Sequence, residues 1–98
     1  MNNQQPQPNK QIKLADNIPG AEYANIMQVS HTKEEFMLMF ANIAGPSGRV
    51  VSKVITSPGH MKRIVAALQE NLKKYEDSFG QIEKADSPNT EMGFGARD

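Results

Sequence analysis

The clearest pattern of hydrophobic and polar positions lies in the stretch ITSPGHMKRIVAALQENLKKYEDSFG. Ser57 and Pro58 are typical of a helix N-cap and first helical position, and Gly80 is typical of the left-handed residue that ends a helix. The pattern predicts a helix from Ser57 to Phe79, and its apolar face must cover something. Apolar residues recur at the helical spacing of three and four at Met61, Ile64, Val65, Leu68, Leu72, Tyr75 and Phe79.

Two shorter segments, EYANIMQVS and GRVVSKVITS, show the alternation and the β-branched residues that favour strands. The AGPSG cluster before the second segment predicts a hairpin loop. In the first segment, Ala24 and Ile26 share one face, and Tyr23, Met27 and Val29 share the other. In the second, the faces are Val50, Ser52, Val54 and Thr56 against Val51, Lys53 and Ile55.

The segment SHTKEEFMLMFANIAGP between them fits two structures. As a helix, it would begin with a capping box of Thr32 and Glu35 and would end at Gly45. Its apolar stripe would then be Phe36, Met39, Phe40 and Ile43. As a strand it would be apolar on both faces, with Phe36, Leu38 and Phe40 on one and Met37, Met39, Ala41 and Ile43 on the other. Periodicity alone does not decide, but architecture favours the strand, because a three-stranded sheet gives the helix a surface to cover.

We therefore expect an α+β fold: a three-stranded antiparallel β-meander followed by one long amphipathic C-terminal helix packed on one face. Residues 16–82 form the single domain, and the polar stretches 1–15 and 83–98 are expected to be disordered tails. One helix covers one face, so the other apolar face would be exposed in a monomer, and such a face usually marks an interface. The expected interface residues are Met37, Met39, Ala41 and Ile43; if the helix covers these, Phe36, Leu38 and Phe40 remain for the partner.

Four stretches of the chain resemble the DUF3467 family, small prokaryotic domains of unknown function. They are YAN at Tyr23 to Asn25, Glu35-Phe36 with its alternating run, RVVSKVITSPGHMKR, and YEDSFG at Tyr75 to Gly80. The resemblance covers about Glu22 to Gly80 and implies strands followed by one helix, which supports the strand at 36–43. It brings no activity, cofactor or catalytic residue. The family often has an acidic residue in the second strand, where this chain has Met39, and this departure makes the strand more apolar.

Composition narrows the class of protein. The chain has 98 residues and no cysteine, which excludes disulfides and thiolate metal sites and leaves oligomerisation as the remaining way to stabilise so small a domain. The formal net charge is +0, whereas a nucleic-acid-binding protein usually has a basic excess. No signal peptide or membrane-spanning run is evident, so we expect a cytoplasmic protein.

The helix start is the best candidate for a site that binds anions or nucleic acid, because helix N-termini attract negative charge. The basic residues near it are Arg49, Lys53, His60, Lys62 and Arg63. A simple cap with solvated basic side chains is the more economical interpretation. His31 and His60 lack metal-ligand spacing, and no phosphate-binding glycine motif occurs, so we expect no enzyme, cofactor or metal.

The function that these expectations favour is a non-enzymatic, self-associating interaction module, most simply a homodimer. It would bind an unidentified protein partner through an apolar sheet face or edge, in the manner of a chaperone. The alternative is a nucleic-acid-binding protein that uses the basic residues around the helix start.

Overall fold

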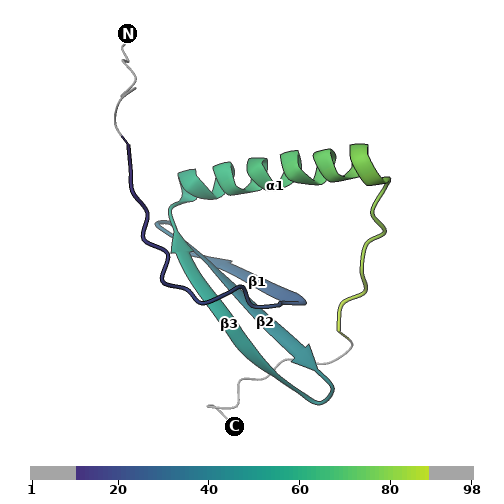
Figure 1. Ribbon diagram of the computed structural model, residues 1–98. Coiled ribbons are helices and arrows are strands. Elements are labelled where there is room, and N and C mark those ends of the chain that lie inside the picture. Colours follow the sequence, from purple (N-terminus) through teal and green to yellow (C-terminus); the bar gives the residue numbers. More distant parts are fainter. Residues whose placement is uncertain (1–10, 89–98) are drawn as a thin grey trace.

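The computed structural model describes residues 11–88 and shows a three-stranded antiparallel sheet followed by one helix (Figure 1). The sheet order is β1-β2-β3, so the strands form a meander, and the predicted α+β fold class is confirmed. The predictions of disorder at 1–10 and 89–98 lie outside the described residues; residues 11–25 and 80–88 contain no helix or strand. The elements are β1 (Ile26–His31), β2 (Phe36–Ala44), β3 (Ser47–Thr56) and α1 (Pro58–Phe79).

The ambiguous segment is a strand, and Thr32 explains how the chain enters it. The Thr32 hydroxyl accepts hydrogen bonds from the backbone N–H groups of Glu34 and Glu35, each at 3.2 Å. The Thr32 N–H donates to the Glu35 carbonyl at 2.9 Å and closes the turn between β1 and β2. A hydroxyl that could cap a helix here caps a hairpin turn instead, because Ser and Thr serve both structures.

The turn between β2 and β3 is the loop that the AGPSG cluster predicts. Ala44 pairs with Ser47, so only Gly45 and Pro46 lie between the strands. Gly45 has φ 64°, a left-handed conformation that favours glycine at the first central position of a two-residue hairpin. The tight turn fixes the register of the two longest strands of the sheet.

The pairing register defines two faces of the sheet. The Leu38 face carries Met27, Val29, Phe36, Leu38, Phe40 and Val54; the Met39 face carries Ile26, Met37, Met39, Ala41, Ile43, Val50 and Ile55. One part of the predicted strand pattern is wrong, because the register shifts between Phe40 and Ala41, where a β-bulge interrupts the β2–β3 ladder. Val50 therefore lies opposite Ala41 and leaves the face of Val54, with which simple alternation grouped it.

β1 begins at Ile26, three residues later than the YAN motif suggested, because a side chain takes over the ladder at its start. The Asn25 side chain donates from Nδ2 to the Ile43 carbonyl and accepts at Oδ1 from the Ile43 N–H, both at 2.9 Å. The Asn25 N–H also donates to the Ala41 carbonyl at 3.0 Å. The amide group of Asn25 thus extends the pairing between β1 and β2 by one residue before β1 begins.

Both ends of α1 agree with the sequence. The Ser57 hydroxyl accepts from the His60 N–H at 3.1 Å, Pro58 occupies the first helical position, and the Gly80 N–H donates to the Glu76 carbonyl at 2.9 Å. Gly80 has φ 100° and ψ 170°, a positive-φ conformation that glycine adopts readily but that lies outside the left-handed helical region that the sequence predicted. Only Ser57 lies between β3 and α1, so the helix leaves directly from the strand.

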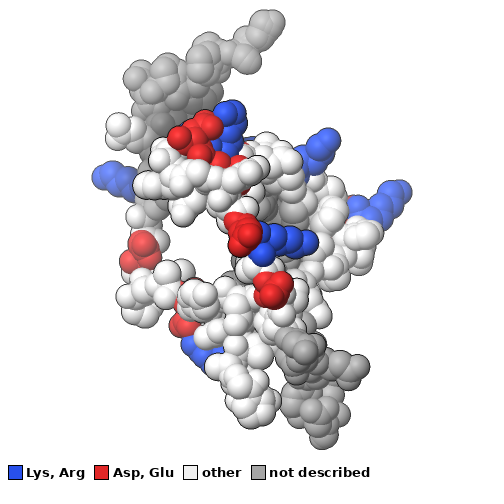
Figure 2. Space-filling view, turned by 90° about the vertical axis from the view of Figure 1, so that its right-hand side faces the viewer, with Lys and Arg blue, Asp and Glu red and all other residues white. Residues whose placement is uncertain are grey.

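The helix follows the sheet as predicted, but it covers the sheet only near its own start. No residue of α1 is buried, and in its apolar stripe only Met61 and Ile64 are half-buried. The helix extends away above the sheet in Figure 1, and Figure 2 shows an opening through the molecule below the helix. The buried apolar side chains in the described residues are Leu38, Met39 and Ala41, all on the central strand. The expectation that α1 packs along one sheet face holds only for its first turns.

Candidate functional site

The largest uncovered apolar surface on an element of regular structure runs along α1. We call it the exposed stripe, and it consists of Val65 (44% exposed), Leu68 (60%), Leu72 (53%), Tyr75 (50%) and Phe79 (76%). At 100° per residue, these side chains and Met61 and Ile64 fall within a sector of about 100° on the helix. Because the sector is narrow and continuous, the stripe suits contact with one elongated partner surface rather than with a small ligand.

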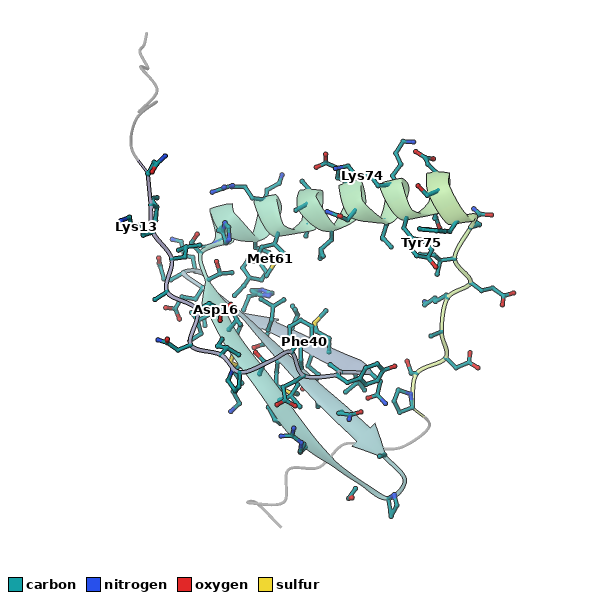
Figure 3. The ribbon with its side chains drawn as sticks, in the orientation of Figure 1. Lys13, Asp16, Phe40, Met61, Lys74 and Tyr75 are labelled. Carbon is teal, nitrogen blue, oxygen red and sulfur yellow. The ribbon has the colours of Figure 1, made fainter. Side chains whose placement is uncertain are left out.

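The aromatic end of the exposed stripe is already ordered. The rings of Tyr75 and Phe79 lie with centroids 5.0 Å apart and an interplanar angle of 47°, a tilted arrangement that aromatic pairs favour. Figure 3 shows Tyr75 pointing to the sheet side of the helix, while Lys74 points to the opposite side. The aromatic pair therefore faces the space below the helix, which no other described element fills.

The opposite side of α1 is charged and internally paired. Lys73 Nζ lies 2.9 Å from Asp77 Oδ2, and Lys74 Nζ lies 3.7 Å from Glu70 Oε2, both between residues four apart. These exposed pairs contribute little to stability, but they identify this side as the solvent side. The helix thus separates a charged face from an apolar one along its whole length.

The structure covers part of the interface that the sequence suggested on the sheet. Met39 and Ala41 are only 3% and 4% exposed, and Met37 and Ile43 are half-buried. The exposure that the prediction assumed is therefore absent at its two central residues, because the chain's own fold covers them. Exposed apolar side chains lie on both faces of the sheet: Met27, Val29 and Val54 on the Leu38 face, each between 44% and 49%, and Ile55 on the Met39 face at 61%.

The sequence interpretation assigned the helix stripe to the core and missed it as a surface. One signal could have found it: Met61, Val65, Leu68, Leu72, Tyr75 and Phe79 are separated by four, three, four, three and four residues. This alternation is the heptad spacing that two helices use to pair with each other. The same spacing is typical of an amphipathic helix that covers a core, so it did not distinguish the two cases.

The five basic residues proposed as an anion site do not form one cluster. Arg49 forms an ion pair with Glu22, and it lies seven residues before Thr56 on an extended strand, roughly 23 Å from the helix start. Lys53 pairs with Met39 in the register and is exposed on that face. His60, Lys62 and Arg63 are exposed on the first turns of α1. Only these last three lie close together.

Within residues 11–88, no three His, Asp or Glu side chains are grouped so that they could hold a metal ion. No helix there combines the length and the apolar composition needed to cross a membrane.

The fold and the exposed stripe define a small α+β chain with an uncovered apolar helix face, and comparison with known proteins identifies its family. The family model described as "Protein of unknown function (DUF3467)" matches residues 1–84. The chain belongs to this family. No curated protein and no solved structure matches it.

Proposed function

We propose that this chain is a non-enzymatic interaction module that self-associates through its uncovered apolar surface and, in that form, binds a macromolecular partner. The single observation that carries the proposal is the exposed stripe on α1, five large apolar side chains that are 44–76% exposed on a helix without a buried residue. Contiguous apolar surface of this kind marks interaction sites in proteins that fold correctly.

The energetics of the helix support the same conclusion. Helices in proteins take most of their stability from packing an amphipathic face, and this helix of 22 residues packs little of its own. Five side chains of roughly 150–250 Å² each, about half exposed, leave on the order of 500 Å² of apolar surface in water. At about 25 cal/mol per Å², covering that area would supply on the order of 10 kcal/mol before the costs of association.

The composition also suits association. With a formal net charge of +0, two copies do not repel each other strongly at neutral pH. The absence of cysteine fits the cytoplasmic location that we propose for the module. A chaperone-like role would use apolar side chains that are exposed on the sheet, because exposed apolar surface marks interaction sites.

Sedimentation velocity of the full chain at a series of concentrations tests the proposal. We expect a concentration-dependent shift from monomer to dimer, and we expect the shift to weaken when Leu72 is replaced by Asp. A wild-type chain that sediments as a monomer throughout the micromolar to millimolar range would refute self-association.

Nucleic-acid binding is the second candidate, and one observation favours it: the first turn of α1 carries no acidic residue, while His60, Lys62 and Arg63 are exposed there. Retention on DNA or RNA that falls steeply with added salt would support it. The double variant Lys62→Glu/Arg63→Glu should abolish that retention. Binding that survives the double variant would exclude the helix start as the contact surface.

A further inference from the structure

The heptad spacing of α1 identifies a specific partner for the exposed stripe. We propose that two copies of this chain pair through their α1 helices in antiparallel orientation, with the twofold axis at the level of residues 69–71. This inference rests on the proposed self-association and deepens it, because it states which surface is shared and in which direction the helices run.

The sizes of the side chains along the seam favour the antiparallel direction. In that arrangement Met61 meets Phe79 of the second copy, Val65 meets Tyr75, and Leu68 meets Leu72, so each layer combines residues of complementary volume. A parallel pair would place every residue opposite itself. The Val65 layer would then be thin, and the Tyr75 and Phe79 layers would be thick. Uniform layers pack more densely in paired helices.

The charges beside the seam favour the same direction. Residues that flank an antiparallel seam meet the same heptad position of the second helix. Lys62 therefore lies within about 3 Å along the axis of Glu76 of the second copy, twice in each dimer, and Gln69 meets its own copy near the axis. In a parallel pair, Lys62 would lie level with Ser57, and Glu76 with Asn71, so no opposite charges would meet.

The area that a stable dimer requires is present. The exposed stripe supplies on the order of 500 Å² per copy, and standard interfaces bury about 800 Å² per partner. The remainder is available on the Leu38 face, where Met27, Val29 and Val54 are about half exposed.

Met61 lies where the helix meets the sheet. Figure 3 shows Met61 pointing from the first turns of α1 toward the sheet, and Figure 2 shows the opening below the helix. In the antiparallel pair, Phe79 of the second copy arrives at the level of Met61. Its ring, 76% exposed in the single copy, would be covered there by contact with Met61.

Single-cysteine variants test the direction of pairing, because the natural chain has no cysteine. With the axis at residue 70, the two Asn71 positions are about 3 Å apart along the axis, and the two Ser78 positions about 24 Å apart. Under mild oxidation, Asn71→Cys should therefore form a disulfide-linked dimer, and the matched variant Ser78→Cys should not. A parallel pair places both positions opposite themselves, so any cross-linking at Ser78→Cys would overturn the antiparallel arrangement.

Charge reversal tests the flanking contacts without introducing a thiol. Lys62→Glu replaces two attractive pairs with two repulsive ones and should weaken dimerisation roughly tenfold in sedimentation. Arg63→Glu makes the same change of charge one residue away from the seam and should leave the dimer unchanged. The double variant Lys62→Glu/Glu76→Lys should restore it. A wild-type dimer that is insensitive to Lys62→Glu and not cross-linked at Asn71→Cys would refute helix pairing and leave self-association standing. A monomeric wild type would refute both.

Discussion

Replacing Leu68 by alanine separates the stability of a single copy from that of the dimer. Leu68 is 60% exposed in the single copy, so truncation removes few existing contacts, and alanine is an excellent helix former. In the dimer the same side chain would be covered. Full burial of a leucine contributes about 1.5–3 kcal/mol, so covering the exposed part contributes roughly 1 kcal/mol per copy.

Two copies contribute to each dimer, so the variant should lose about 2 kcal/mol of dimerisation free energy, equivalent to an approximately 30-fold rise in Kd. Sedimentation equilibrium measures this value directly. Urea unfolding at a dilution where the wild type is monomeric should show nearly equal midpoints for the two proteins. This comparison distinguishes a lost interface from a damaged fold.

The matched control is Glu70→Ala, two residues along and therefore on the solvent side of α1. It breaks the exposed pair with Lys74, which should change stability by a few tenths of a kcal/mol and leave the dimer intact. Equal dimer Kd values for Leu68→Ala and Glu70→Ala would show that Leu68 does not lie in the dimer interface. If Leu68→Ala mainly lowers the urea midpoint of the monomer, Leu68 belongs to a core instead.

Two further predictions concern the sheet. Asn25→Ala removes both hydrogen bonds to Ile43 and should lower the free energy of unfolding by about 1–2 kcal/mol in urea titration; an unchanged midpoint would show that water replaces the amide. Gly48→Ala places a Cβ 2.8 Å from a backbone carbonyl oxygen of the facing strand and should cost about 1–3 kcal/mol. Nothing lies within 4 Å of a Cβ built at Gly59, so Gly59→Ala should instead raise the free energy of unfolding by about 0.5–1 kcal/mol. Equal thermal shifts for the two glycine variants would show that the room around each glycine does not decide the effect.

The order of elements could be predicted because local signals and architecture agreed. The caps at Ser57 and Gly80 and the β-branched residues of β3 each favour one structure with little competition. The segment at Phe36–Ala44 needed more than its own pattern, because it satisfies both periods. The number of strands needed for a core decided it correctly.

Three features lay beyond the pattern of apolar positions. The β-bulge beside Ala41 changes the face of Val50, and alternation assumes an unbroken ladder. The amide of Asn25 replaces a strand residue, which its residue type alone does not specify. The position of α1 relative to the sheet is set by the whole chain, so an apolar stripe predicts a partner surface but not whether that surface belongs to the same molecule.

The short connection between β3 and α1 determines where the two sheets would lie in the dimer. A joint of one residue, Ser57, leaves little freedom between strand and helix, so the sheet is held as a rigid extension of the helix start. Antiparallel helices of 22 residues, about 33 Å long, would then hold two identical sheets at opposite ends of a stiff spacer. The dimer would bind a target with two matching sites at that separation through both sheets, with an avidity that neither sheet alone provides.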